Sequence, residues 1–206
     1  DVVNKIGNGV TPRGGSEVYQ DEGIPFLRSQ NVHDEGLQLS NISFIPLDIH
    51  NNMKNSQLKA GDILINITGA SIGRTCIVPS NLGEANISQH VVFLRIKKRL
   101  NAEYLSLFLK SAFVKNYIRF EQNGASKEAF TLDQISTIPL ILPGVLEQQV
   151  ITDYLDAKTA QIDRKFHLLA QKADKYAKLK QSLINETVTR GLDKTVPMKE
   201  SGVKWI

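Results

Sequence analysis

The sequence predicts an α+β protein in which a globular mixed α/β domain is followed by one long α-helix. Its first hundred residues alternate short apolar segments with turn-forming residues, a pattern typical of short strands. No proline interrupts the segment between Gly144 and Gly191, and apolar residues recur there every seven positions, as in a helix that pairs with another helix. We therefore expect a globular domain in residues 1–143, a helical spacer or dimerisation region in residues 144–192, and a tail in residues 193–206.

The globular domain is expected to begin with short strands joined by irregular loops. Turns such as Gly7–Gly9 and Asp34–Gly36 separate apolar pieces such as Ile24–Leu27 and Ile42–Ile45. Frequent glycine and asparagine between short apolar segments indicates strands rather than helices.

Three stronger apolar segments predict the central strands of the domain. The first, Gly61–Ile67, is entered through a turn and followed by another turn at Gly69–Arg74, which leads into a second strand at Thr75–Val78. The third, His90–Lys97, is apolar on both faces early and alternates later.

Helical spacing follows these strands. Asn101 can cap a helix with an apolar stripe, and this helix is expected to continue until just before Asn123. Thr131 and Gln134 have the spacing of a capping box, which predicts a second, short helix. The two prolines of Ile138–Pro143 favour extended backbone before the long helix begins.

The long helix carries one strong apolar seam. A helix of about 45 residues would be roughly 65–70 Å long, more than one small domain needs internally. The column three residues after the seam is mostly charged, starting with Lys158 and Lys165, so we expect pairing with a single partner helix. The alternative is a helix folded onto its own domain. The seam residues are Leu155, Ile162, Leu169, Tyr176 and Leu183.

Composition sets broad limits on the class of protein. The net charge of +4 permits binding to nucleic acid without requiring it. No apolar run approaches the ~20 residues of a membrane span. The single cysteine, Cys76, lies in an apolar run and predicts a buried thiol and a reducing, cytoplasmic location. Because the chain starts at Asp1 without an initiator methionine, we expect an excerpt or a trimmed protein.

Catalytic and metal-binding patterns are not found. The four histidines are far apart in the sequence, and none has the spacing of a metal-ligand motif. Gly69, Ser71 and Gly73 match a serine-nucleophile spacing, but no typical acid–histidine pair follows. We expect no catalytic residue, no metal and no cofactor, and we keep an enzyme that uses Ser71 as an alternative.

Polar side chains at strand ends and turns are the candidate binding residues. Asparagine, glutamine, serine and arginine can bind base edges, and arginine and lysine also bind phosphates. The alternative is that these side chains cap turns and satisfy loop backbone. Lys115 and Arg119 could add phosphate contacts. The candidates are Arg28, Asn31, Asn66, Thr68, Ser71, Arg74, Ser88, Gln89 and Lys127.

Taken together and in order, several stretches resemble the DNA-specificity subunit of type I restriction–modification systems. The resemblance covers nearly the whole chain and depends on the order and spacing of its stretches. These stretches include Gly9–Pro12, Gly23–Arg28, Leu58–Ile65, Thr68–Arg74, Ala85–Val91, Glu147–Ile151, Tyr154–Asp156, Gln161–Asp163 and Glu186–Asp193.

The resemblance implies a division of roles. A target-recognition domain would bind one half of a bipartite site on double-stranded DNA, and long helices would pair as an antiparallel coiled coil. These helices would also dock the modification (methyltransferase) subunits, which bind S-adenosylmethionine. A restriction subunit would associate indirectly, and the specificity subunit itself would not be catalytic.

The chain departs from this family pattern in one respect. Family members usually carry two recognition domains and two helical regions, whereas this sequence has one of each, and Ser201–Ile206 resembles the start of a second recognition domain. We therefore expect either a fragment or a half-length subunit, which would act as a homodimer. A coiled-coil adaptor that does not recognise DNA remains the alternative.

Overall fold

The computed structural model describes residues 2–123, 129–198, 200 and 202–204. The chain forms two compact units, Asp1–Asp153 and Tyr154–Ile206, which are considered separately below. The first unit contains all of the strands described and four helices, together with the first turns of a fifth helix.

An antiparallel four-stranded sheet lies at the centre of the first unit, with the strand order β1-β9-β6-β7. Leu64 pairs with Phe93 on one side and with Cys76 on the other. The three central strands predicted from sequence are confirmed with nearly the same bounds. The strands are β1 (Val3–Asn8), β6 (Ile63–Asn66), β7 (Thr75–Ile77) and β9 (Val91–Ile96).

Two smaller sheets are built from the turn-rich part of the chain. In the first, β2 pairs antiparallel with β5 and parallel with β8, and in the second β3 pairs with β4. A short helix, α1 (Leu47–Asn52), follows β5. The strands are β2 (Ile24–Leu27), β3 (Val32–His33), β4 (Gly36–Leu37), β5 (Ser43–Ile45) and β8 (Asn86–Ile87).

Three further helices complete the domain: α2 (Ala102–Lys110), α3 (Ala112–Asn123) and α4 (Leu132–Ser136). Both predicted caps are confirmed, since the side chain of Asn101 accepts a hydrogen bond from the backbone of Tyr104, and Thr131 forms a capping box that starts α4.

The single helix predicted between Asn101 and Asn123 is wrong, because the helix breaks at Ser111. Ser111 adopts an extended backbone with φ −63° and ψ 153°. Its hydroxyl accepts a hydrogen bond from the amide of Val114 at 3.4 Å, and its carbonyl accepts one from Lys115 at 3.0 Å. Serine caps a new helix more favourably than it continues an old one, so α3 starts afresh.

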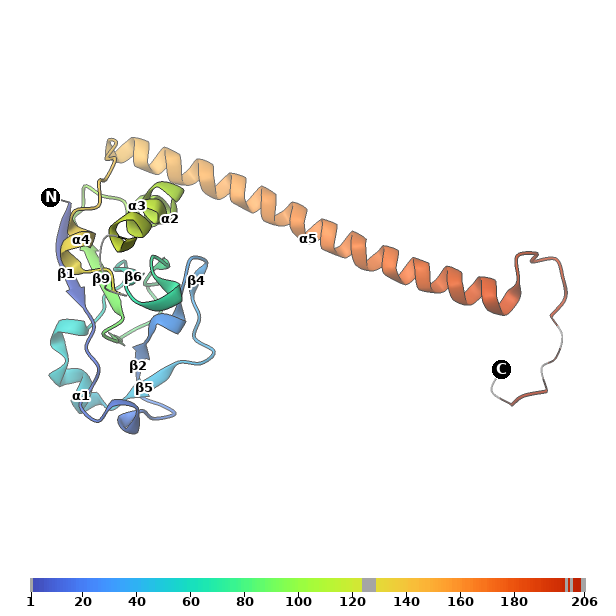
Figure 1. The fold of residues 1–206 in the computed structure, drawn as a ribbon, viewed down its shortest axis with the longest axis horizontal. Coiled ribbons are helices and arrows are strands. Elements are labelled where there is room, and N and C mark those ends of the chain that lie inside the picture. Colours follow the sequence, from blue (N-terminus) through green and yellow to red (C-terminus); the bar gives the residue numbers. More distant parts are fainter. Residues whose placement is uncertain (1, 124–128, 199, 201, 205–206) are drawn as a thin grey trace. The chain divides into compact units, whose positions relative to one another are not determined.

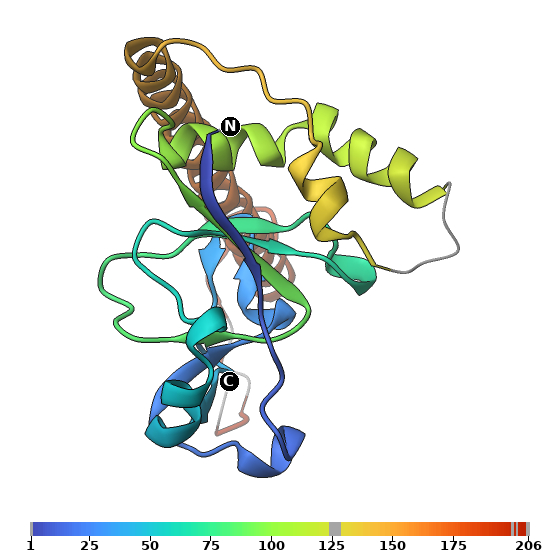
Figure 2. The same cartoon turned by 90° about the vertical axis from the view of Figure 1, so that its left-hand side faces the viewer.

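Alternating side chains place the central sheet between two apolar layers. Ile63 and Ile65 pack against α2, α3 and α4 on one face, whereas Leu64 and Phe93 pack against the smaller sheets on the other. Figure 2 shows these helices on one side of the sheet and β2 on the opposite side. Cys76 lies in the second layer, and burial raises the pKa of its thiol to about 11, which confirms the predicted buried thiol.

The predicted long helix is confirmed as α5 (Val145–Arg190), which Figure 1 shows as one continuous helix. At 1.5 Å per residue its length is about 70 Å. In its first turns, Gln148 is fully buried, accepts a hydrogen bond from the amide of Asn101 at 2.8 Å, and donates one to the carbonyl of Pro143 at 2.9 Å. These contacts explain why the start of α5 belongs to the first unit. The α+β class is therefore confirmed.

Candidate nucleic-acid interface

Polar side chains gather at the edge of the central sheet where β6 ends and β9 begins. These strands are antiparallel neighbours and Asn66 pairs with Val91, so the residues that follow β6 meet those that precede β9. The hydroxyl of Thr68 and Nδ1 of His90 are 2.9 Å apart, and Nε2 of His90 lies 3.4 Å from the amide nitrogen of Gln89. We call Thr68, Gln89 and His90 the polar edge. It presents both donors and acceptors.

Asn66 anchors the turn beside the polar edge. Its side chain is fully buried and donates hydrogen bonds to the carbonyl of Ser29 at 2.8 Å and to the hydroxyl of Ser71 at 3.1 Å. Its backbone carbonyl accepts a hydrogen bond from Gly73 at 2.9 Å, and its backbone amide donates one to Arg74 at 3.0 Å. Asn66 therefore fixes the turn Gly69–Arg74 against the segment that follows β2.

Asn31 has a similar structural role. It is 1% exposed, and its side-chain oxygen accepts a hydrogen bond from the backbone amide of Arg28 at 2.9 Å. Its side-chain nitrogen donates to the carbonyl of Gln38 at 2.9 Å. The chain around Arg28 is thereby folded into a tight turn next to Ser29, the residue that Asn66 contacts.

Three buried polar atoms have no hydrogen-bond partner among the described residues: Nε of Arg28, Oδ1 of Asn66 and Oγ of Ser88. Their residues surround the end of β2, because the amide of Ser88 donates to the carbonyl of Leu27 at 2.8 Å and Asn66 bonds to Ser29. The guanidinium of Arg28 also lies 5.6 Å from the ring centre of Tyr19. An unpartnered buried polar atom costs about 1–3 kcal/mol, so these three atoms distinguish this region from ordinary core.

A hollow of about 370 Å³ lies between the Gly69–Arg74 turn and α3. We call it the basic hollow, because among the described residues three cationic side chains and one carboxylate line it. Its charged and polar side chains are Asp34, Arg74, Lys115, Arg119 and Gln122.

Asp34 holds Lys115 in place at the basic hollow. Nζ of Lys115 lies 2.6 Å from Oδ2 of Asp34, and Oδ1 of Asp34 accepts a hydrogen bond from the backbone amide of Thr75 at 3.0 Å. Burial raises the pKa of the Asp34 carboxyl, but the hydrogen bonds from Lys115 and Thr75 outweigh it, so the net pKa is lowered. Asp34 is therefore ionised at neutral pH, while Arg74 and Arg119 remain exposed.

The structure brings most of the predicted binding residues to one region, although not in equivalent environments. Thr68 and Gln89 lie at the polar edge, and Arg74 lies at the basic hollow. Asn31, Asn66 and Ser88 are buried. Ser71 and Arg28 are partly buried beside Asn66, and Lys127 lies outside the described residues.

Sequence reasoning missed two features of this region. His90 was not among the predicted binding residues, yet it completes the polar edge with Thr68. The convergence of Arg74 with Lys115 and Arg119 was also missed, although each residue type was recognised. The available signal was the pairing of neighbouring antiparallel strands, which brings residues 68 and 90 together.

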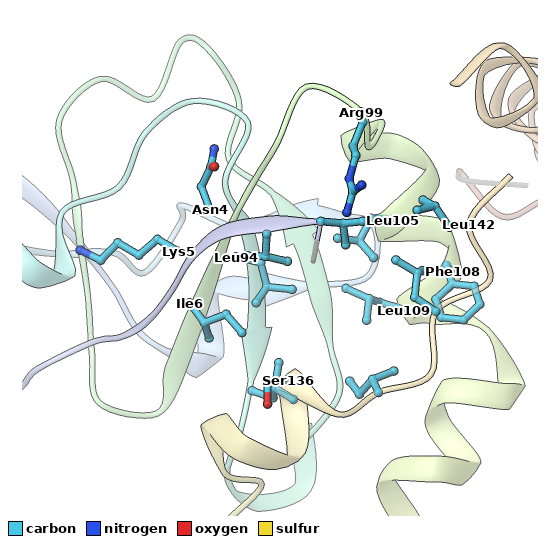
Figure 3. Close-up of a pocket in the computed structure, with 15 residues that line it drawn as sticks. Asn4, Lys5, Ile6, Leu94, Arg99, Leu105, Phe108, Leu109, Ser136 and Leu142 are labelled. Atoms are coloured by element: carbon cyan, nitrogen blue, oxygen red, sulfur yellow. The ribbon is translucent and has the colours of Figure 1, made fainter. Parts of the chain in front are cut away.

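A second hollow, of about 450 Å³, lies between β1, α2 and the segment around Ile138 (Figure 3). Leu105, Phe108 and Leu109 form much of its apolar lining. The lining contains no carboxylate, histidine or cysteine among the described residues, and its polar side chains are Asn4, Lys5, Arg99 and Ser136.

Other kinds of site are not found among the described residues. No group of three or more histidine, cysteine, aspartate or glutamate side chains is placed to hold a metal ion. Within the same part of the chain, no helix is both long and apolar enough to cross a membrane. The hydroxyl of Ser71 accepts a hydrogen bond from the side-chain amide of Asn66 at 3.1 Å, and among the described residues it donates none to a histidine.

Comparison with known sequences identifies a family and several relatives. The family model of the type I restriction modification DNA specificity domain matches residues 1–172. The StySPI specificity subunit of a type I restriction enzyme from Salmonella potsdam is 24% identical over 190 residues, covering 90% of this chain and 40% of that protein. The EcoKI specificity subunit from Escherichia coli K12 is 24% identical over 155 residues, covering 70% of this chain and 31% of that protein.

Solved structures show the same fold. A chain from work on complex assembly and conformational transition of the type I R-M system has a TM-score of 0.69 at 22% identity, covering 91% of this chain and 44% of the other. The HsdS subunit from Thermoanaerobacter tengcongensis has a TM-score of 0.61 at 21% identity, and the match covers 92% of this chain and 44% of that subunit. This chain spans less than half the length of each of these relatives. Because the family model covers most of the sequence, the chain belongs to the type I restriction modification DNA specificity domain family.

Proposed function

We propose that this chain recognises one half of a bipartite site on double-stranded DNA, as the specificity component of a type I restriction–modification complex. The observation that carries this proposal is the match of residues 1–172 to the DNA specificity domain family, which includes the whole globular unit. The polar edge supports it, because exposed amide, hydroxyl and imidazole groups can bind base edges in a groove.

In this proposal the chain itself is not catalytic and binds no cofactor. The modification subunits would bind S-adenosylmethionine and transfer its methyl group, and a restriction subunit would join the complex indirectly. The hydrogen bonding of Ser71 supports a structural role for this residue rather than nucleophilic chemistry.

The helix α5 would dock the modification subunits and pair antiparallel with a second helix. Support comes from its seam, where the exposed fractions of Ile162, Leu169 and Leu183 are 50%, 63% and 53%. Apolar side chains repeated every seven residues gain free energy when a partner helix covers them. If the chain is a natural half-length subunit, the partner would be a second copy, and the DNA site would be symmetric.

The test combines this chain with its modification subunit and maps the adenines that become methylated. We expect methylation at one short recurring sequence and salt-dependent binding of the chain to duplex DNA, because phosphate contacts release counterions. Methylation that does not depend on this chain, together with no DNA binding at low salt, would contradict the proposal.

A coiled-coil adaptor without DNA recognition is the second candidate, favoured only by the exposed seam of α5. The same experiment distinguishes the two. An adaptor would still assemble with the modification subunit, but it would show no sequence preference and no salt-dependent affinity for DNA.

A further inference from the structure

We infer that the basic hollow binds a phosphate of the DNA backbone, so that Arg74 holds the backbone and does not read a base. This inference rests on the proposed function and adds to it a division of labour. The polar edge would contact bases, and the hollow between the Gly69–Arg74 turn and α3 would fix the position of the duplex.

Charge favours an anion at this place. Arg74 comes from the turn, and Lys115 and Arg119 come from α3, so cations approach the hollow from two separate elements. Asp34, the carboxylate that the described part of the lining contains, is already paired with Lys115 at 2.6 Å. The two arginines are exposed and therefore supply the excess positive charge.

The two arginines also have the right chemistry for phosphate. A guanidinium presents several N–H donors in a planar fork that fits phosphate oxygens, and it stays charged at all physiological pH values. The volume of ≈ 370 Å³ can hold a phosphate together with part of its sugar. Arg119 donates a 3.3 Å hydrogen bond to Asn116, which lies one turn earlier on the same helix face.

The surrounding structure positions these groups before DNA arrives. Asn66 fixes the end of the turn that carries Arg74, through backbone bonds to Gly73 and Arg74 of 2.9 and 3.0 Å. Asp34 joins the start of β7, through Thr75, to Lys115 of α3. The turn and the helix are thus tied to the same carboxylate and the same strand. Such preorganisation reduces the entropic cost of binding.

The polar edge and the basic hollow share one short segment of chain. Thr68 is the residue immediately before the turn, and Ser71, inside it, is held by Asn66. If the base edges of a duplex contact Thr68 and Gln89, the sugar–phosphate backbone next to those bases would lie near Arg74, because Arg74 ends the turn that Thr68 precedes. Phosphate contacts set register and orientation without carrying sequence information, whereas base contacts specify.

The test compares the whole chain with the variants Arg74→Ala and Arg119→Ala, on the cognate duplex and on a shuffled duplex, across a range of salt concentrations. We expect each variant to bind both duplexes more weakly by a similar factor. The slope of log affinity against log salt should become shallower by about 0.9 for each lost phosphate contact.

Lys98→Ala is the matched control. It also removes one exposed positive charge, but Lys98 follows β9 at the opposite end of this strand from Gln89. We expect its affinity and salt slope to equal those of the unmodified chain. Thermal unfolding of each variant verifies that the fold is retained.

Different outcomes separate the inference from the proposed function. If Arg74→Ala weakens only cognate binding and leaves the salt slope unchanged, Arg74 reads a base and the inference is wrong. Equal slopes for both arginine variants and Lys98→Ala would also overturn it. If the unmodified chain binds no duplex DNA at any salt concentration, the proposed function itself fails.

Discussion

At the scale of single residues, Asn66 and Ser88 show why residue type alone does not identify a binding residue. Both were predicted to lie near DNA, and both are buried beside the end of β2. Asn66 makes two side-chain hydrogen bonds, whereas the hydroxyl of Ser88 has no partner among the described residues. The sequence shows that both are polar residues at strand ends. Whether their side chains are exposed depends on how strands distant in sequence pack together, which the sequence does not show.

This difference predicts effects of very different size on stability. Asn66→Ala removes the support of Ser29 and Ser71 and leaves buried polar groups unpaired, so we expect the free energy of unfolding to fall by about 2–3 kcal/mol. Ser88→Ala removes an atom without a partner in the described part of the chain, so we expect a change below about 0.5 kcal/mol. Urea denaturation measures both. A comparable loss in Ser88→Ala would show that its hydroxyl does have a partner.

The ion pair of Asp34 predicts a pH dependence. The folded pKa of Asp34 is lower than its ordinary value of 3.8, so the pair stabilises the fold above about pH 4 and is lost as the pH falls through the folded pKa. Because water screens a partly exposed pair, we expect Asp34→Asn to lower the free energy of unfolding at neutral pH by at most about 1 kcal/mol. Urea titrations between pH 7 and pH 3 should show the two proteins converging at the acid end. A constant difference would contradict this account.

At the scale of elements, features that depend on neighbouring residues were predicted well, and features that depend on residues distant in sequence were not. The caps at Asn101 and Thr131 depend on neighbouring residues, so the sequence was sufficient. The break at Ser111 was missed because the apolar stripe continues across it, and packing of α2 and α3 on the sheet decides where the chain bends. The polar edge depends on pairing between β6 and β9, whose ends are far apart along the chain.

The junction of β1 with the segment before β9 yields an element-scale prediction. Gly9 donates a hydrogen bond from its amide to the carbonyl of Val91 at 3.0 Å, and a Cβ at this position would overlap the backbone oxygens of Ile87 and Ser88. Backbone cannot move aside as a flexible side chain can, so we expect Gly9→Ala to cost at least about 3 kcal/mol of stability. Gly15→Ala is the control, because a Cβ at Gly15 would meet no atom within 4 Å. We expect it to cost less stability than Gly9→Ala, since only the positive φ of 59° adds backbone strain there. Circular dichroism during thermal unfolding would show the difference, and an unchanged melting temperature for Gly9→Ala would refute the close approach.

At the scale of the whole molecule, the sequence predicted the long helix because a seven-residue repeat needs no tertiary information. The partner that covers this repeat cannot be identified in the same way. Leu169 lies at the middle of the seam and is 63% exposed, so it contributes little to the stability of α5 by itself. We expect Leu169 to contribute substantial stabilising free energy only when another helix covers its side chain.

We therefore expect Leu169→Asp to leave the helix content of the chain unchanged while weakening self-association or docking of the modification subunit, since a buried charge in the seam is costly. Gln171→Asp is the matched control. It introduces the same charge about 200° further around the helix, at the usual 3.6 residues per turn. Light scattering gives the mass of each protein, and co-purification with the modification subunit measures docking. If Leu169→Asp has the same mass and assembles as well as Gln171→Asp, the seam is not the pairing surface, and the exposed apolar residues of α5 need another explanation.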